Sequence, residues 1–126
     1  MTIGEIVRLF DCVVYTPDLY TPERIVDHAF CADLMSDALM IMSTVTDHST
    51  LEKGALITGL ATNQSIRTAE MLDVGVVLLV RGKVPADPVV ELANESGILL
   101  LGTKKTMFNA SGMMYERGVR GITSPQ

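Results

Sequence analysis

Short apolar runs recur at a regular spacing in the second half of the chain. They begin at residues 54, 75 and 97, so their starts lie 21 and 22 residues apart. Each run is long enough for a buried strand and too short to cross a membrane. Segments with helical spacing fill the intervals, as is typical of βα units that feed one parallel sheet. We expect strands over Ala55–Gly59, Gly75–Val80 and Ile98–Leu101.

Each of these strands is followed by a segment with helix signals. Asn63–Leu72 places apolar side chains at helical spacing on one face. Asp87 followed by Pro88 is a helix start, because aspartate can cap the first turn and proline needs no hydrogen bond there. That helix should end at Gly97, and the last helix should cover Thr106–Arg117.

The first half of the chain opens with a further helix signal. Thr2 and Glu5 have capping-box spacing, so we expect a short amphipathic helix over Ile3–Phe10. Cys12–Tyr15 is rich in strand-forming residues and predicts a short strand. In Arg24–Ala32, apolar residues alternate along the segment, which favours a strand over a helix.

A helix should follow this last strand. Leu34–Met42 carries apolar residues at helical spacing, and Asp33 or Ser36 can cap its first turn. Ser43–Glu52 is polar and predicts a loop, in which a helical turn could also form. No linker or low-complexity tract divides the chain, so we expect one domain over residues 1–126. The predicted architecture is α/β, with a mostly parallel sheet and helices on both faces.

The overall composition narrows the classes of partner. The chain has 126 residues, 48% of them hydrophobic, which is sufficient for a core. Its 10 basic and 15 acidic residues give a net charge of −5, opposite in sign to a general nucleic-acid or anionic-membrane binder. The N-terminus lacks a signal-peptide pattern. We therefore expect a cytoplasmic protein that binds neither nucleic acid nor membrane.

The sequence shows no strong catalytic or metal-binding signature. Nucleophile elbows, phosphate-binding loops and paired-cysteine zinc motifs are all absent from it. His28 and His48 have no Cys, Asp or Glu at metal-ligand spacing. Cys12 and Cys31 are expected to be buried, reduced thiols. We therefore expect a protein that is not an enzyme and uses no cofactor or metal.

Half of the basic residues lie at or just after the C-terminal ends of the strands predicted in the second half of the chain. In a parallel sheet these strand ends and the N-termini of the following helices meet at the same edge. These five of the ten are Arg67, Arg81, Lys83, Lys104 and Lys105. The pattern predicts a cradle for a small anion such as a phosphate or carboxylate. A simpler alternative is that these residues are helix caps and solubilising charges. The candidate ligand-binding residues are Asp33, Ser36, Thr58, Gly59, Thr62, Asn63, Gln64, Ser65, Arg67, Arg81, Lys83, Thr103, Lys104 and Thr106.

The methionines suggest a further surface. There are eight, mostly on predicted helices, where flexible thioethers usually fill the core. Met113 and Met114 are adjacent, so we expect only one of them to face the core and the other to meet a loop or a second subunit. This apolar surface predicts a homodimer, and the methionine-bearing helix over Leu34–Met42 is the other candidate interface.

The order of four motifs resembles that of DRTGG-domain proteins. The motifs are Ala29–Asp37, Thr62–Ile66, Gly97–Ile98 followed by Thr103, and Tyr115–Gly118. The resemblance covers nearly the whole chain and is closest to short, stand-alone members often encoded beside iron-only hydrogenases. It implies an α/β fold like that of the N-terminal domain of HPr kinase.

The resemblance also implies a regulatory or ligand-sensing role. Relatives are attached to phosphotransacetylases and CBS-domain proteins, and no catalytic residues are established for the domain. Many relatives have Gly-Asp-Arg where this chain has Ala61–Asn63, so no role of that Asp–Arg pair transfers. The leading hypothesis is a regulatory module that binds a small anionic metabolite or nucleotide at the C-terminal edge of the sheet. The alternative is a non-catalytic scaffold or assembly factor, such as one for a hydrogenase system.

Overall fold

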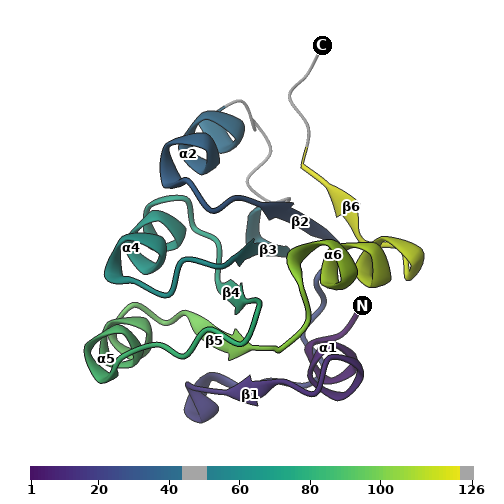
Figure 1. Ribbon diagram of the computed structural model, residues 1–126, viewed down its shortest axis with the longest axis horizontal. Helices are drawn as coiled ribbons and strands as arrows, with labels where there is room; N and C mark the ends of the chain where they lie inside the picture. Colours follow the sequence, from purple (N-terminus) through teal and green to yellow (C-terminus); the bar gives the residue numbers. More distant parts are fainter. Residues whose placement is uncertain (44–50, 123–126) are drawn as a thin grey trace.

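The computed structural model describes residues 1–43 and 51–122. Within these ranges, six strands form one sheet in the order β1-β5-β4-β3-β2-β6 (Figure 1). Strands β2 to β6 are parallel to their neighbours, and β1 pairs antiparallel with β5 at one edge. The strands are β1 (Val13–Val14), β2 (His28–Cys31), β3 (Gly54–Thr58), β4 (Val76–Leu79), β5 (Leu99–Gly102) and β6 (Arg120–Gly121).

The connections between strands place helices on both faces of the sheet. Strands β2 to β5 lie side by side in chain order, so α2 (Met35–Ser43), α4 (Asn63–Met71) and α5 (Asp87–Glu95) all cross the same face (Figure 1). After β5 the chain returns through α6 (Met107–Glu116) across the opposite face to β6, where α1 (Ile3–Leu9) also lies. The α/β architecture predicted from the sequence is confirmed.

Two hydrophobic clusters fill the spaces between the sheet and its helices. One joins Ile66 and Ala69 of α4 to Leu100 and other strand residues. The second joins α1 and α6 to strand residues that alternate with the first set, including Leu99. Every residue of β3, β4 and β5 is buried, because both faces of these strands are covered. The uninterrupted apolar runs in the sequence follow from this arrangement.

Most of the predicted elements appear within one or two residues of their expected bounds. The capping box is present: the Glu5 amide donates to the Thr2 hydroxyl, and the Glu5 carboxylate accepts from the Thr2 amide at 3.0 Å. A short 3₁₀ helix, Pro17–Leu19, lies in the proline-containing loop after β1. The predicted loop over Ser43–Glu52 falls mostly on residues 44–50, which lie outside the described residues, as does His48.

Several local predictions are wrong. Asp87 is the first helical residue of α5, and its N-cap is Ala86, which has no capping side chain. Asp33 does not cap α2, because its carboxylate accepts a hydrogen bond from the Gly59 amide instead. The short strand β6 was not predicted, since two exposed residues leave no apolar pattern to detect.

The adjacent methionines of α6 both contact the same core, contrary to prediction. Met114 is 1% exposed, and Met113 is half-buried against the same cluster. A long, flexible thioether can bend toward the core from a neighbouring helix position, so adjacency does not force one of them outward. The homodimer expectation therefore loses this support and stays a prediction.

Within residues 1–43 and 51–122, no helix combines the length and apolar character that a membrane crossing requires.

Candidate functional site

The chain changes face between β4 and β5, at the C-terminal edge of the sheet. The connection after β4 leads to α5 on one face, whereas the connection after β5 leads to α6 on the other (Figure 1). Open α/β sheets bind ligands in the crevice outside such a topological switch point, because the diverging connections leave space between them. A ligand-binding site is therefore expected at this edge of the sheet, between β4 and β5.

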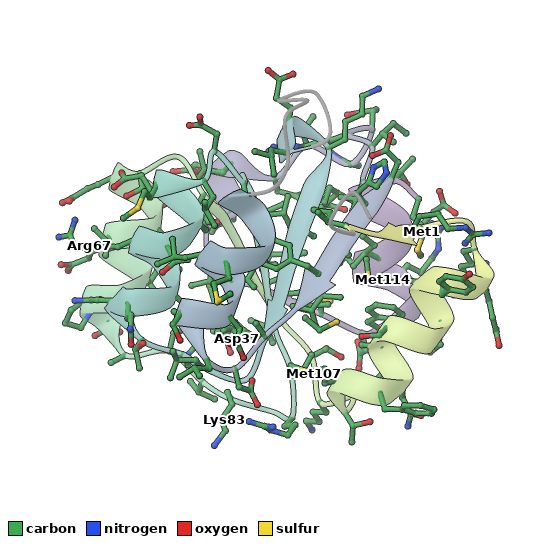
Figure 2. All side chains as sticks on the ribbon, turned by 90° about the horizontal axis from the view of Figure 1, so that it is seen from above. Met1, Asp37, Arg67, Lys83, Met107 and Met114 are labelled. Carbon is green, nitrogen blue, oxygen red and sulfur yellow. The ribbon has the colours of Figure 1, made fainter. Side chains whose placement is uncertain are left out.

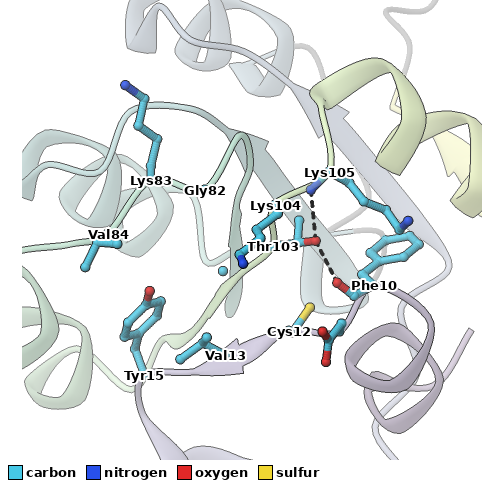
Figure 3. Close-up of a pocket in the computed structure, with 12 residues that line it drawn as sticks. Phe10, Cys12, Val13, Tyr15, Gly82, Lys83, Val84, Thr103, Lys104 and Lys105 are labelled. Carbon is cyan, nitrogen blue, oxygen red and sulfur yellow. Dashed lines mark hydrogen bonds between the residues drawn. The ribbon is translucent and has the colours of Figure 1, made fainter.

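A pocket of about 460 Å³ lies at this switch point (Figure 3). Its size is within the roughly 300–1,000 Å³ range of small-molecule sites. Three segments line it: the end of α1 with β1, the loop after β4 and the loop after β5. The lining residues are Phe10, Asp11, Cys12, Val13, Tyr15, Gly82, Lys83, Val84, Gly102, Thr103, Lys104 and Lys105.

Backbone hydrogen bonds hold the two loops of the switch point together. The amides of Arg81 and Gly82 donate to the carbonyls of Lys105 and Thr103 at 2.8 and 2.9 Å. Arg81 and Gly82 both have positive φ, 62° and 69°, so the chain turns sharply after β4. This turn directs the next residues, Lys83 and Val84, along the mouth of the pocket.

The third wall of the pocket comes from the N-terminal part of the chain. Buried Thr16 fixes this segment against β5: its hydroxyl donates to the Ile98 carbonyl and accepts from the Leu100 amide at 2.9 Å. Tyr15 lies over Gly102, where an added Cβ would come within 2.7 Å of the Tyr15 ring. The absence of a side chain at Gly102 therefore gives the tyrosine its place in the pocket wall.

The charges at the pocket are uneven. Lys104 extends toward the space between Tyr15 and Cys12, Lys105 lies beside Phe10, and Lys83 points away from the pocket (Figure 3). Lys83 and Lys104 are exposed, and Lys105 is half-buried. Burial, reinforced by the nearby Asp11 carboxylate, raises the pKa of the Cys12 thiol to about 12. That thiol is consequently neutral at pH 7 and does not repel an anion. The pocket lining thus combines three lysines and one carboxylate, Asp11, with mostly apolar side chains.

Arg81 serves a different contact from the one expected. Its guanidinium turns away from the pocket and lies against Gly59, where an added Cβ would overlap it. Nη1 then donates to the Asp33 carboxylate at 3.2 Å, and the same carboxylate accepts from the Gly59 amide at 2.7 Å. The three residues connect the ends of β2, β3 and β4. Arg81 is therefore paired with Asp33 and lies outside the lining of the switch-point pocket.

The Asp33 contact predicts a pH effect on stability. The Gly59 hydrogen bond, and after it Arg81, hold the pKa of Asp33 below its ordinary value of 3.8. Because the folded-state pKa is depressed, the stabilisation is present above the ordinary value and is lost as the pH falls through the lowered one. We expect Asp33→Asn to destabilise the protein at pH 7, with a difference from wild type that shrinks below about pH 4. Urea titrations at pH 7, 4 and 3 would measure this.

The exposed residue Asp18 of the 3₁₀ helix offers a matched control for that series. Asp18→Asn removes a carboxylate elsewhere on the surface, so it reports the general effect of one fewer negative charge. A gap between wild type and Asp33→Asn that stays constant from pH 7 to 3 would contradict the assigned role of the carboxylate.

The polar turn before α4 lies outside the switch-point pocket. Thr62 is the N-cap, with no side-chain capping bond, and Asn63 and Gln64 are exposed at the start of the helix. The Ser65 hydroxyl is buried within hydrogen-bond distance of the Leu60 and Thr62 carbonyls, so the helix itself uses it. None of the four lines the switch-point pocket.

The remaining predicted residues are dispersed along the edge. Arg67 projects from the flank of α4, away from the end of the sheet where Lys83 lies (Figure 2). Thr58 is fully buried, and its hydroxyl accepts from the Leu60 amide. Thr106 caps α6, and Ser36 is exposed on α2. Of the predicted set, the structure brings together only Lys83, Thr103 and Lys104 at the pocket.

Sequence reasoning missed the N-terminal wall of the pocket. Val13 and Tyr15 were predicted only as part of a short strand, and nothing local shows that this strand pairs antiparallel beside β5. The one available signal was Gly102, a glycine at the end of an apolar strand. Such a glycine often marks a place where another group approaches the backbone closely.

The two cysteines are free and lie far apart. Cys12 precedes edge strand β1, whereas Cys31 ends β2, four strand spacings away and hence about 19 Å across the sheet. Cys31 is exposed, contrary to prediction, and its Sγ lies 3.0 Å from the Ser111 hydroxyl. Among residues 1–43 and 51–122, no cluster of three His, Cys, Asp or Glu residues could hold a metal ion.

The fold is similar to that of the CBS and DRTGG domains of the regulatory region of Clostridium perfringens pyrophosphatase, solved with its activator diadenosine tetraphosphate. The TM-score is 0.63 and the sequence identity is 14%, over 90% of this chain and 45% of that chain. This likeness supports the expected DRTGG-like fold, and the chain spans less than half of that protein's length. Comparisons with protein-family models and with curated proteins find no match.

Proposed function

We propose that the chain is a regulatory module that binds a small anionic metabolite in the switch-point pocket. The observation that carries this proposal is the set of three lysines, Lys83, Lys104 and Lys105, that lines an otherwise mostly apolar pocket, with Lys104 extending into it. Lys104 is exposed, so its attraction for an anion is that of a charge near the protein surface, and the two neighbouring ammonium groups add to it. The rest of the protein is acidic, so the positive charge is local rather than general.

A binding role fits the site better than a catalytic one. The Cys12 thiol is protonated at neutral pH, and the pocket lining contains no histidine that could activate a nucleophile. The structurally similar pyrophosphatase region is regulatory and was solved with an activating nucleotide. We extend this role, and a cytoplasmic location, to the present chain as part of the proposal.

The first test is a ligand titration on wild-type protein. Inorganic phosphate, acetate, AMP and diadenosine tetraphosphate would be screened by thermal shift and then titrated by calorimetry. A ligand present at a hundredfold excess over its Kd stabilises the folded state by about 2.7 kcal/mol, so its binding should be visible as a raised Tm.

Lys104→Met should weaken the binding of any ligand found by about 10- to 150-fold, because it removes a charge-assisted hydrogen bond and keeps the side-chain length. Lys53→Met is the matched control, since Lys53 is exposed next to the first residue of β3, at the opposite edge of the sheet. Equal losses in the two variants would mean that only the net charge matters. Binding unchanged in Lys104→Met would contradict the assigned site.

A second candidate function rests on the outer face of α6. Phe108 is 84% exposed and Tyr115 is 61% exposed, and they lie about two turns apart along that helix. Large apolar groups on one exposed face favour contact with another protein, either a second copy of this chain or a separate partner. We propose the hydrogenase system suggested by the sequence resemblance as the first partner to test. If none of the ligands raises the Tm, this docking function takes first place.

A further inference from the structure

We infer that the ligand of the pocket is a nucleoside phosphate, with its base between Tyr15 and Val84 and its phosphate at Lys104. This inference rests on the proposed binding function and specifies the ligand class. The inference divides the pocket into two parts. The apolar part would bind the base, and the cationic part would bind the phosphate.

The apolar part of the pocket exposes large hydrophobic side chains that a bound ligand would cover. Val84 is 75% exposed and Val13 is 54% exposed, and both line the same pocket as the half-buried Tyr15 ring. They come from different segments, the loop after β4 and strand β1, and lie on either side of the tyrosine (Figure 3). A flat, largely apolar group could cover all three side chains at once.

Tyr15 has the properties of a base-reading side chain. Its ring lies against Gly102, where any side chain would clash with it, and its amide donates to the Leu100 carbonyl at 2.9 Å. The hydroxyl end points toward the loop that carries Val84 (Figure 3). An aromatic ring held in place offers a stacking surface that any nucleobase can use, and its hydroxyl can form a hydrogen bond to the edge of the base.

The cationic part limits how much negative charge the pocket takes. Of the three lining lysines, Lys104 extends toward the Tyr15 side of the pocket (Figure 3), and the lining also contains one carboxylate, Asp11, so the charges suit a single phosphate group at Lys104. Lys83 and Lys105 line other parts of the pocket, where they would meet further phosphates of a longer nucleotide. An inorganic phosphate or a sugar phosphate would use Lys104 but would leave the Tyr15–Val84 surface uncovered.

The test compares phosphate ligands with and without a base, and adds benzoate as an aromatic anion that has neither a phosphate nor a nucleobase. Calorimetric titrations would use AMP, GMP and UMP, with ribose 5-phosphate, inorganic phosphate and benzoate as the base-free set. We expect at least one nucleotide to bind about 5- to 150-fold more tightly than ribose 5-phosphate, the range expected for stacking of one base on an aromatic ring.

Variants then test which part of the pocket binds the base and which part binds the phosphate. Tyr15→Ala should remove the advantage of the nucleotide and leave the affinity for ribose 5-phosphate unchanged, whereas Tyr15→Phe should keep most of the advantage. Lys104→Met should weaken both ligands together. Tyr115→Ala is the aromatic control, because Tyr115 lies on the exposed face of α6 and outside the pocket. Circular dichroism melts would confirm that each variant is folded.

The outcomes separate this inference from the proposed function. If ribose 5-phosphate or benzoate binds as tightly as every nucleotide, the base is not read and the inference is overturned, while anion binding stands. Unchanged nucleotide affinity in folded Tyr15→Ala overturns it as well. If no ligand of either set binds, the proposed function itself fails.

Discussion

Replacing either Leu99 or Leu100 by alanine should lower the free energy of unfolding by about 2–5 kcal/mol. The two leucines are adjacent on β5 and point to opposite faces of the sheet. Leu99 packs in the cluster beneath α1 and α6, and Leu100 packs in the cluster beneath α2, α4 and α5. They are 1% and 0% exposed, so each truncation leaves a cavity in a separate core.

The informative feature of this pair is that both losses should be large. In a sheet covered on one face only, one of two adjacent residues would be exposed and its truncation would cost little. Val84→Ala provides the exposed reference on the same fold and should change stability by less than about 0.5 kcal/mol. Urea unfolding at pH 7 would measure all three variants. A small loss for either leucine would mean that one helix layer does not cover β5 in solution.

The parallel part of the fold was predictable because its physical signals are local. Strands buried on both faces must be continuously apolar, and the helices between them must be amphipathic, so each βα unit leaves its own pattern in the sequence. The capping box at Thr2 and Glu5 is equally local, since both partners lie within one helical turn. These elements therefore appear close to their expected positions.

The arrangement of the site was less predictable, because it depends on pairing between distant segments. Tyr15 reaches the pocket only because β1 turns back antiparallel beside β5, a contact across more than 80 positions of chain that includes the Thr16–Leu100 hydrogen bond. Nothing in Cys12–Tyr15 alone specifies that neighbour. Strand order, and hence the position of the switch point, likewise emerges only when the sheet is assembled.

Arg81 shows that a side chain can lie where the sequence predicts it and still make a contact that the sequence does not reveal. Its position after β4 places it at the C-terminal edge, as expected from the sequence. However, whether a cation there is open to a ligand depends on the nearest carboxylate. Asp33 follows a different strand, β2, and lies 48 positions away in the chain, yet it accepts from the arginine. Charge counting along the sequence cannot detect such a pairing.

Thr103 was predicted to bind the ligand, and the structure instead predicts a structural role that can be tested separately. Its side chain is 4% exposed. The hydroxyl donates to the Phe10 carbonyl at 2.8 Å and accepts from the Lys105 amide at 3.3 Å. Its own amide and carbonyl are bonded to Leu79 and Gly82. The residue thus joins the end of α1 to both loops of the switch point, with its side-chain and main-chain polar groups already engaged.

Thr103→Val should therefore reduce stability by about 1–3 kcal/mol, because it keeps the shape of the side chain and leaves the Phe10 carbonyl and the Lys105 amide without their partner. Thr103→Ser keeps the hydroxyl and should lose less, since only a methyl group is removed. Urea unfolding of the two variants would give this difference, and phosphate or AMP titration of the folded proteins would give the affinity. If Thr103→Val keeps wild-type stability and loses ligand affinity, the hydroxyl contacts the ligand directly and the structural role assigned to it is wrong.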